Sequence, residues 1–220
     1  MKKRIAIITG ASGGIGREFT ILMVRENVDE IWAIARNQTK LVALKKQFGE
    51  KVIAISKDLS DPKEVHSIEA MLRAEMPVVA YLINNAGIAR MGSYSEFTTK
   101  EIEEIISVNC SAVATLCAVC IPFMQAGSRI LNISSASSFQ PLPYLNLYAA
   151  SKAFVRSYSR ALHAELKSKK ITVTAVCPGW VDTELLWKKI NGKKVSYPGL
   201  VSAGKVAKKA LKNFIQLKFL

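Results

Sequence analysis

The sequence predicts an α/β protein in which a single doubly wound parallel sheet lies between two helical layers, giving three layers (α/β/α). Short runs rich in Ile and Val alternate with amphipathic segments of helix length. The strand-like runs are apolar almost throughout, which is typical of strands that helices cover on both faces. No linker, low-complexity tract or internal repeat divides the chain, so we expect one domain over residues 1–220.

These patterns assign the elements in chain order. Strands are expected at residues 4–9, 30–35, 52–56, 79–84, 129–134 and 171–177. Helices are expected at residues 14–26, 38–48, 62–75, 98–124, 148–168 and 202–213. Ligands of such sheets bind outside the carboxyl ends of the strands, near the point where the strand order reverses. The residues that follow each strand are therefore the candidates for a site.

The composition is that of a soluble globular protein. The chain is 50% apolar and 22% charged, as in soluble globular proteins. The apolar run at residues 5–8 is too short for a signal peptide, and polar residues interrupt the other apolar stretches well short of about 18 residues. We therefore expect no membrane-spanning helix. Four cysteines without a secretory signal fit the reducing cytoplasm, which is the expected location.

Cysteine and histidine do not predict a metal site. Cys117 and Cys120 form a C-x-x-C spacing, but the surrounding segment is apolar nearly all round, which favours core packing over a redox or metal role. His66 and His163 are far apart and lack partners at metal-ligand spacing, so we expect a structural or surface role for each.

The first strand leads into "TGASGGIG" at residues 9–16. Gly10 allows a sharp turn, and Gly14 and Gly16 remove side chains where a pyrophosphate and the sheet approach the next helix. A flexible turn is the alternative for a glycine cluster alone. The preceding strand and the following helix favour a dinucleotide site.

Arg36 follows the second strand. A dinucleotide fold that selects NAD usually places an acid here to bind the ribose 2′-hydroxyl, but no acid occurs between Arg36 and Glu50. A guanidinium suits a 2′-phosphate, so we expect NADP(H) in preference to NAD(H). A solvated arginine at a helix start is the alternative.

The next strand ends also carry polar groups. Asp58 and Leu59 follow the third strand, where they are expected to border an adenine. "NNAG" at residues 84–87 follows the fourth strand, and "SSASS" at residues 134–138 follows the fifth. Each alone is compatible with an ordinary turn.

"YAASK" at residues 148–152 places a phenol and an ammonium four residues apart. Tyr148 and Lys152 therefore share one helix face, where the cation is expected to lower the pKa of the phenol from about 10 toward neutrality. An incidental pair at a helix start is the alternative for this motif taken alone.

Six motifs together resemble those of the short-chain dehydrogenase/reductase family, whose members have a Rossmann fold. They are "TGASGGIG", "NNAG", "VN" (108–109), "ISS" (133–135), "YAASK" and "PGWVDT" (178–183), and they occur in the order and spacing of that family. The resemblance covers residues from about 4 to 185.

The resemblance implies a role for each matched position. Tyr148 would donate a proton to the substrate carbonyl, and Ser135 would bind the carbonyl oxygen. Lys152 would also bind the nicotinamide ribose, and Asn109 would hold a water linked to the lysine. Ser134 is an adjacent candidate, but the 13-residue spacing to the tyrosine favours Ser135. The implied cofactor contacts are Gly10, Ser12, Gly13, Gly14, Ile15, Gly16, Arg36, Asp58, Leu59, Asn85, Ala86, Gly87, Tyr148, Lys152, Pro178, Gly179, Val181 and Thr183.

The substrate pocket is less constrained by these motifs. Residues 184–201 correspond to the family's mobile lid, whose apolar side chains either contact substrate or pack the lid onto the body. The candidate lining residues are Phe139, Pro141, Leu142, Tyr144, Leu185, Leu186 and Trp187. This mixture fits an apolar carbonyl compound or alcohol, such as a steroid, a fatty acyl chain or a small ketone.

We expect a C-terminus that is shortened relative to the family pattern, in which a further strand follows the last helix. A short edge strand at 214–219 is all that the remaining residues allow. Because the family's last strand builds one of its two subunit interfaces, the resemblance implies a homodimer through the helices at about 98–124 and 148–168. The small residues expected on those faces are Ala112, Ala114, Ala118, Ala149, Ala150 and Ala153.

Charge is concentrated at the C-terminus. The net charge is +14, and residues 183–220 contribute +8 through nine lysines and one acid, Glu184. A nucleic acid, an anionic membrane or a carrier-linked acyl group could bind there, but a solvated lysine-rich helix face is favoured. Few aromatic residues interleave with the lysines, so no nucleic-acid partner is expected.

The expected function is therefore hydride transfer between NADP(H) and a small-molecule carbonyl or secondary alcohol, with Tyr148 as the acid/base. The rival hypothesis is a nucleotide-binding scaffold that keeps the fold without the chemistry. Such relatives typically lose the tyrosine, lysine or serine, and all three are present.

Overall fold

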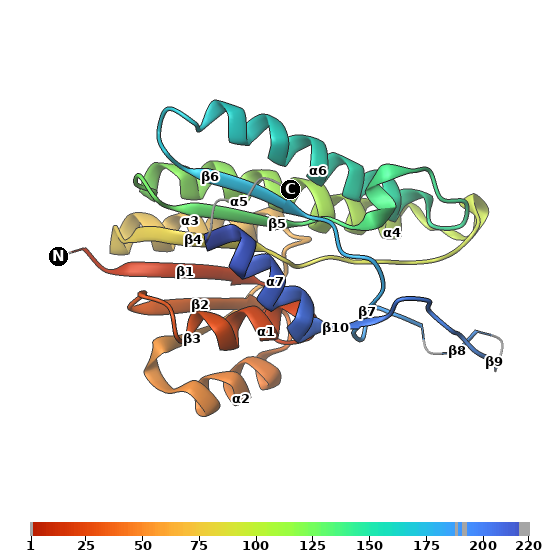
Figure 1. Cartoon of the computed structure of the whole chain (residues 1–220), viewed down its shortest axis with the longest axis horizontal. Helices are drawn as coiled ribbons and strands as arrows, with labels where there is room; N and C mark the ends of the chain where they lie inside the picture. Colours follow the sequence, from red (N-terminus) through yellow and green to blue (C-terminus); the bar gives the residue numbers. More distant parts are fainter. Residues whose placement is uncertain (1, 188, 191–192, 216–220) are drawn as a thin grey trace.

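A computed structural model of the chain describes residues 2–187, 189–190 and 193–215. Its centre is a parallel sheet of six strands in the order β3-β2-β1-β4-β5-β6, with helices on both faces (Figure 1). The strands are β1 (Arg4–Thr9), β2 (Glu30–Ala35), β3 (Val52–Ser56), β4 (Val78–Asn84), β5 (Arg129–Ile133) and β6 (Thr172–Val176). The strand order reverses between β1 and β4, so the sheet is doubly wound as predicted.

Strand residues alternate between two hydrophobic clusters. Along β1, Ile5 and Ile7 belong to the cluster on one face of the sheet, whereas Ala6 and Ile8 belong to the cluster on the other. All four are fully buried. Successive side chains along a strand point to opposite faces, and both faces are buried in a core. This explains why the strand sequences are apolar throughout.

One face of the sheet is covered by α3 (Pro62–Glu75), α5 (Ala112–Cys120) and α6 (Asn146–Glu165). Cys117 and Cys120 are fully buried free thiols in this cluster, which confirms that the C-x-x-C spacing reflects core packing. The His163 imidazole accepts a bond from the Val173 amide at 3.2 Å and so has a structural role, whereas His66 is exposed on α3.

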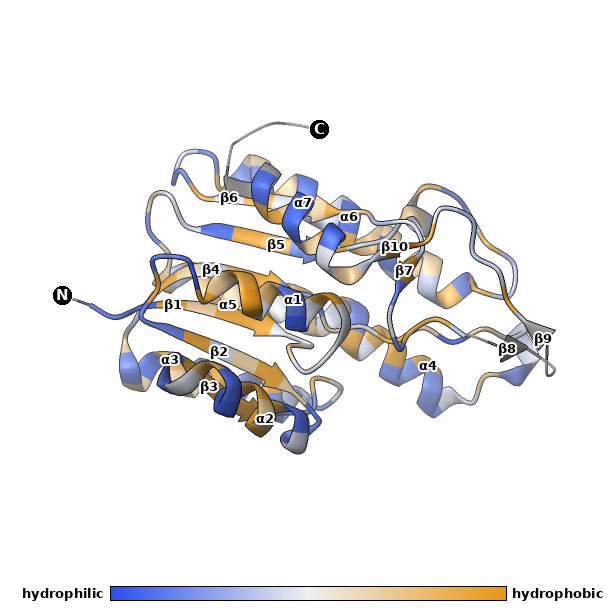
Figure 2. Ribbon diagram, turned by 60° about the horizontal axis from the view of Figure 1, so that its bottom comes forward, coloured by the Kyte–Doolittle hydropathy of each residue, from blue (hydrophilic) through white to orange (hydrophobic). Residues whose placement is uncertain are grey.

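The opposite face is covered by α1 (Gly14–Met23), α2 (Gln38–Phe48) and α7 (Ala203–Ile215). Figure 2 shows the central strands as mostly apolar ribbons, while the helices alternate apolar and polar residues around their axes. On α7, Ala207 and Leu211 are buried, whereas the side chains of Lys205 and Lys208 are exposed. The lysine-rich face of this helix is therefore solvated.

Most predicted bounds agree with the structure to within three residues. Short connecting elements were not predicted: the 3₁₀ turns η1 (Gly49–Lys51), η2 (Tyr94–Glu96), η4 (Ile121–Phe123) and η5 (Ala136–Phe139), and the two-residue strands β7 (Val181–Asp182), β8 (Lys189–Ile190), β9 (Lys193–Lys194) and β10 (Val201–Ser202). β7 pairs with β10 in parallel, so the polypeptide between them, which contains most of the expected lid, leaves the body and returns to it.

The expected helix at 98–124 is interrupted. It consists of α4 (Thr99–Ile106), a π-helical turn η3 (Ser107–Ser111), α5 and the turn η4. The expectation that no apolar stretch is long enough to cross a membrane needs correction, because Thr99–Phe123 qualifies by length and composition. Its inner face, including Leu116 and Cys117, packs against the sheet, as core helices of soluble proteins also do. The absence of a membrane span therefore stays a prediction.

The structure describes only residues 214 and 215 of the expected edge strand at 214–219, and these two are not in a strand. Residues 214 and 215 continue α7, and residues 216–219 lie outside the described part of the chain. Within the described residues, β3 and β6 form the two edges of the large sheet.

Candidate active site

The glycine-rich turn is fixed to the turn after β4. The Thr9 hydroxyl accepts bonds from the amides of Asn85 and Ala86 at 2.9 and 3.0 Å, and the Asn85 side-chain amide donates to the Thr9 carbonyl at 3.1 Å. Gly10 follows with φ +64°, a conformation that glycine adopts without strain. The two neighbouring strand ends at the switch point are therefore held as one unit.

α1 begins where this turn has no room for side chains. A Cβ atom on Gly16 would lie 2.2 Å from the Gly10 carbonyl oxygen, so the helix can approach the turn only with glycine there. Gly13 is the N-cap residue, no side chain caps the helix, and its first turn has no acid. The amides at this helix start are therefore available to an anion such as a pyrophosphate.

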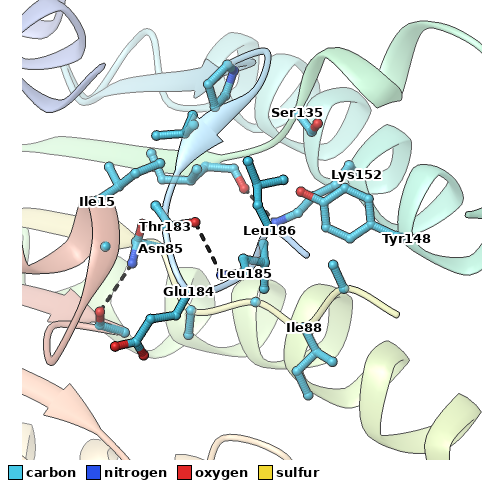
Figure 3. Close-up of a pocket in the computed structure, with 18 of the residues that line it drawn as sticks. Ile15, Asn85, Ile88, Ser135, Tyr148, Lys152, Thr183, Glu184, Leu185 and Leu186 are labelled. Carbon is cyan, nitrogen blue, oxygen red and sulfur yellow. Dashed lines mark hydrogen bonds between the residues drawn. The ribbon is translucent and has the colours of Figure 1, made fainter. Parts of the chain in front are cut away.

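Ser135, Tyr148 and Lys152 come together on one wall of a cavity (Figure 3). Ser135 follows β5, while the other two side chains come from the first turns of α6. The Lys152 ammonium lies 5.6 Å from the centroid of the Tyr148 ring, and it donates to the Ile133 carbonyl at 2.9 Å. The spacing in "YAASK" thus places the amine beside the phenol, as predicted.

Ser134 has a different position from Ser135. Its hydroxyl is buried and donates to the Lys152 carbonyl at 2.7 Å, which ties α6 to the end of β5. Ser135 lines the cavity and interacts through its hydroxyl with Tyr148. The geometry therefore assigns Ser134 to positioning α6 and leaves Ser135 facing the cavity.

Asn109 lies on the π-helical turn η3 and is completely buried. Its side-chain oxygen accepts from the Ile88 amide at 2.8 Å, and its side-chain amide donates to the Ile88 carbonyl at 2.9 Å and to the Ser151 hydroxyl at 3.0 Å. A π-helical turn rotates the residues after it relative to an α-helix, and such turns are frequent at functional sites. Here it directs one amide to both the segment after β4 and the start of α6.

Burial shifts the pKa values of the two titratable groups in opposite directions. It lowers the pKa of Lys152 to about 8, so the ammonium still predominates about tenfold at pH 7. Burial raises the pKa of Tyr148, and the hydrogen bond with Ser135 offsets this in part. The predicted lowering of the phenol pKa is therefore wrong for this structure, because desolvation outweighs the hydrogen bond with Ser135. A protonated phenol is nevertheless the form that can donate a proton.

The far end of the cavity is basic. Arg36 is exposed and bonds Glu104 of α4 at 3.2 Å. Burial alone would raise the pKa of Asp58, but bonds from Ser60 and the charge of Arg36 outweigh it and lower that pKa. The Asp58 carboxylate is therefore held by Ser60, and the adjacent Leu59 is buried.

The turn after β6 closes the cavity from the side of α1. The Ala136 amide donates to the Pro178 carbonyl at 2.8 Å, which ties this turn to the one that carries Ser135. Thr183 lies against the start of α1, where a Cβ on Gly14 would approach its methyl group to 3.1 Å. Val181 is buried within β7.

Most of these groups surround one cavity of about 760 Å³. Every predicted cofactor or catalytic residue lines it except Gly16 and Asn109, which lie behind its wall. Of the predicted apolar residues, Leu142, Leu185, Leu186 and Trp187 also line it, but Phe139, Pro141 and Tyr144 do not. Phe139 and Tyr144 are exposed, and the Arg156 guanidinium covers the Phe139 ring at 4.2 Å.

Sequence reasoning missed several cavity residues. Trp180 and Tyr197 contact each other with ring centroids 4.8 Å apart, although 17 positions separate them in the sequence. Met91 and Lys40 also line the cavity. Lys40 could have been noticed four residues after Arg36 in the first turn of the following helix, but its partner Glu184 could not have been predicted.

Known proteins resemble the chain in both sequence and structure. The family model for short chain dehydrogenase matches residues 4–194. The chain is 36% identical over 193 residues to very-long-chain 3-oxoacyl-CoA reductase of Anas platyrhynchos, covering 82% of this chain and 60% of that protein. It is 33% identical over 191 residues to NADPH-dependent 1-acyldihydroxyacetone phosphate reductase of Saccharomyces cerevisiae, covering 85% and 64%. The chain thus spans about three fifths of the length of these curated relatives.

Solved structures agree with this similarity. A short-chain dehydrogenase from Sphingobium yanoikuyae in complex with NADPH superposes with a TM-score of 0.83 at 31% identity, covering 96% of this chain and 84% of that one. A short chain dehydrogenase from Burkholderia cenocepacia in complex with NADP gives a TM-score of 0.81 at 26% identity, covering 97% and 89%.

Gly16→Ala is expected to lower the free energy of unfolding by about 1–3 kcal/mol, because the new methyl group would overlap the Gly10 carbonyl. Gly13→Ala is the matched control, since a Cβ there meets nothing within 4 Å. Urea denaturation followed by circular dichroism measures both. Equal stability of the two variants would contradict the tight packing at Gly16.

Proposed function

The chain belongs to the short-chain dehydrogenase/reductase family, and from this we propose that it is an NADP(H)-dependent oxidoreductase that reduces apolar ketones. The observation that carries the proposal is the convergence of Ser135, Tyr148 and Lys152 on the wall of a cavity that extends to the glycine-rich turn. A scaffold protein would have no need of this arrangement, so catalysis explains it better.

Tyr148 is the proposed proton donor. The Ser135 hydroxyl binds the substrate carbonyl oxygen and stabilises the negative charge that develops there. The phenol of Tyr148 donates its proton to that oxygen, which completes the alcohol, and the resulting phenolate is stabilised by the Lys152 ammonium beside the ring. In the oxidation direction the same groups act in reverse.

The residues around the cavity fit a dinucleotide. The glycine-rich turn leaves no space for side chains at Gly16, and the amides at the start of α1 have no protein cap. These features suit a pyrophosphate. Lys152, beside Tyr148, lines the same cavity as Pro178 and Thr183, and these residues are proposed to hold the nicotinamide riboside. NADP(H), when bound, supplies or accepts the hydride.

NADP(H) is proposed in preference to NAD(H) because of Arg36. It stands at the end of β2, where an acid would serve an NAD-specific site, and its guanidinium is exposed at the rim of the cavity. A relative named as NADPH-dependent and two similar structures with NADPH or NADP support this choice.

The substrate is proposed to be a ketone on a long acyl chain. Met91, Leu142, Trp180, Leu185 and Trp187 form an apolar wall. Met91, Trp180, Leu185 and Trp187 remain 40–42% exposed, so the wall extends to the mouth and offers surface to a long chain. The two curated relatives are named for reducing a very-long-chain 3-oxoacyl-CoA and a 1-acyldihydroxyacetone phosphate.

A homodimer through α5 and α6 is also proposed. Ala118 and Ala150 are exposed, and Phe154, which stacks on Tyr158 at 5.8 Å, is 41% exposed on α6. Ala112 and Ala149 are buried within the subunit, so their expected place in the interface was wrong. An exposed apolar helix face of this kind favours association.

Tyr148→Phe is expected to lower kcat by about a hundredfold or more, because the proton donor is lost, while NADPH affinity changes little. NADPH oxidation is followed with a long-chain 3-oxoacyl thioester, a steroid ketone and a small ketone, and the long-chain thioester should give the highest kcat/KM. Tyr144→Phe is the matched control, since Tyr144 is exposed and outside the cavity. Near-normal turnover by Tyr148→Phe would rule out the assignment of the proton donor.

Arg36→Asp is expected to weaken NADPH binding about tenfold or more and to improve binding of NADH, because the 2′-phosphate loses a cation and the 2′-hydroxyl gains an acceptor. The ratio of kcat/KM for the two cofactors measures the change. Arg25→Asp, at an exposed position that does not line the cavity, is the control. An unchanged ratio for Arg36→Asp would show that another group reads the phosphate.

Phe154→Arg is expected to shift the protein from dimer to monomer in sedimentation equilibrium, since it places a charge in the proposed apolar interface. Tyr94→Arg changes an 86% exposed aromatic residue outside α5 and α6 and should leave the dimer intact. A wild-type protein that sediments as a monomer at micromolar concentration contradicts the proposed assembly.

A further inference from the structure

Three cations line the end of the cavity that lies beyond the glycine-rich turn. Arg36 follows β2, Lys40 is in the first turn of α2, and Lys57 follows β3. Each is paired with an acid in this structure: Arg36 with Glu104 at 3.2 Å, Lys40 with Glu184 at 2.7 Å, and Lys57 with Glu64 at 2.8 Å. An anionic ligand at this end must therefore compete with carboxylates for the cations.

The Lys40–Glu184 pair differs from the other two because its acid also lines the cavity. The Lys40 ammonium donates to both oxygens of the Glu184 carboxylate, at 2.7 and 2.9 Å, although 144 positions separate the two residues. The bond joins α2 to the segment that follows Thr183, so it connects two elements that both line the cavity. The bond and charge of Lys40 also lower the pKa of Glu184 below its ordinary value.

The pair is well placed to exchange partners. The exposed fractions of the two side chains are 43% for Lys40 and 83% for Glu184, and exposed ion pairs contribute little to stability. A phosphate monoester carries up to two negative charges and three acceptor oxygens, so it binds an ammonium more strongly than a single solvated carboxylate does. Lys40 can therefore exchange Glu184 for a phosphate with little loss of stability.

We propose that Lys40 is a second specificity determinant for the 2′-phosphate of NADP(H), and that Glu184 is the counter-ion which the phosphate displaces. The inference rests on the proposed function and adds two residues to it. Lys40 favours the cofactor that carries the phosphate. Glu184 opposes that cofactor, both by occupying Lys40 and by repelling a second anion. Neither residue changes the affinity for NAD(H), which has no phosphate at this position, so the preference arises from the affinity for NADP(H) alone.

The exchange also acts on the substrate side of the cavity. Glu184 is part of a turn in which Thr183 accepts bonds from the amides of Leu185 and Leu186, at 3.3 Å through its hydroxyl and 3.2 Å through its carbonyl. Leu185 and Leu186 line the cavity. Loss of the bond to Lys40 releases this turn from α2. The apolar wall is therefore less restrained when NADP(H) is bound than when NAD(H) is bound.

The test is a titration of NADPH and of NADH against the full chain and three variants, Lys40→Met, Glu184→Gln and the double variant. Lys40→Met is expected to weaken NADPH binding about tenfold or more and to change NADH binding less than about twofold. Glu184→Gln is expected to tighten NADPH binding about two- to fivefold at low salt, with NADH unchanged. In the Lys40→Met background, Glu184→Gln should have a clearly smaller effect.

A matched control pair lies at the end of α2, with Lys45 on that helix and Glu50 on the turn η1 that follows it. Lys45 and Glu50 form an exposed ion pair at 3.1 Å that does not line the cavity, so Lys45→Met and Glu50→Gln should leave both affinities unchanged. Thermal unfolding of each variant checks that the fold is retained.

Three results overturn the inference. If Lys40→Met weakens the binding of NADPH and NADH equally, the lysine binds a part that both cofactors share. If Glu184→Gln weakens NADPH binding, the ion pair persists over the bound cofactor and is not displaced by it. These failures are distinct from failure of the proposed function. A wild-type protein without any preference for NADPH contradicts the proposed function itself, whereas a preference that responds to Arg36→Asp and not to Lys40→Met contradicts only the role of Lys40.

Discussion

Burial of the Lys152 ammonium is the constraint on which the site depends. A cation that is 4% exposed needs a fixed acceptor, and the Ile133 carbonyl at the end of β5 provides it. Ser134 bonds the lysine's own carbonyl, so the first turns of α6 are fixed to β5 from two directions. These bonds set the position of the Tyr148 phenol relative to Ser135. The relative positions of the three proposed catalytic groups thus follow from the hydrogen bonds that one buried cation requires.

The switch point between β1 and β4 extends this rigidity to the cofactor end. Thr9 and Asn85 hold the two strand ends together, and Asn109 holds the segment after β4 against the start of α6. The glycine-rich turn and the proposed catalytic groups are therefore linked through these hydrogen bonds and the short segment from Asn85 to Ile88. A dinucleotide bound along this path would meet preorganised groups at both ends, which limits the ordering needed on binding.

Much of the fold and site could be predicted because the relevant signals are local. Apolar runs of β-branched residues identify strands, and the four-residue spacing of Tyr148 and Lys152 identifies a shared helix face. The π-helical turn at Asn109 could not be predicted, since it is stabilised by bonds to Ile88, 21 positions away. The raised pKa of Tyr148 likewise results from tertiary burial. The outward position of Phe139 depends on packing with Arg156, which the sequence does not indicate.

The distribution of tryptophans gives the protein intrinsic optical reporters. Of the three indoles in the chain, Trp180 and Trp187 line the cavity, whereas Trp32 on β2 is completely buried in the core on one face of the sheet. Emission from the first two overlaps the absorption of a reduced nicotinamide, so their excited states can transfer energy to a nearby dihydropyridine. Trp32 emits from a dry environment that persists as long as the sheet does. Fluorescence can therefore follow occupancy and integrity of the molecule without an added dye.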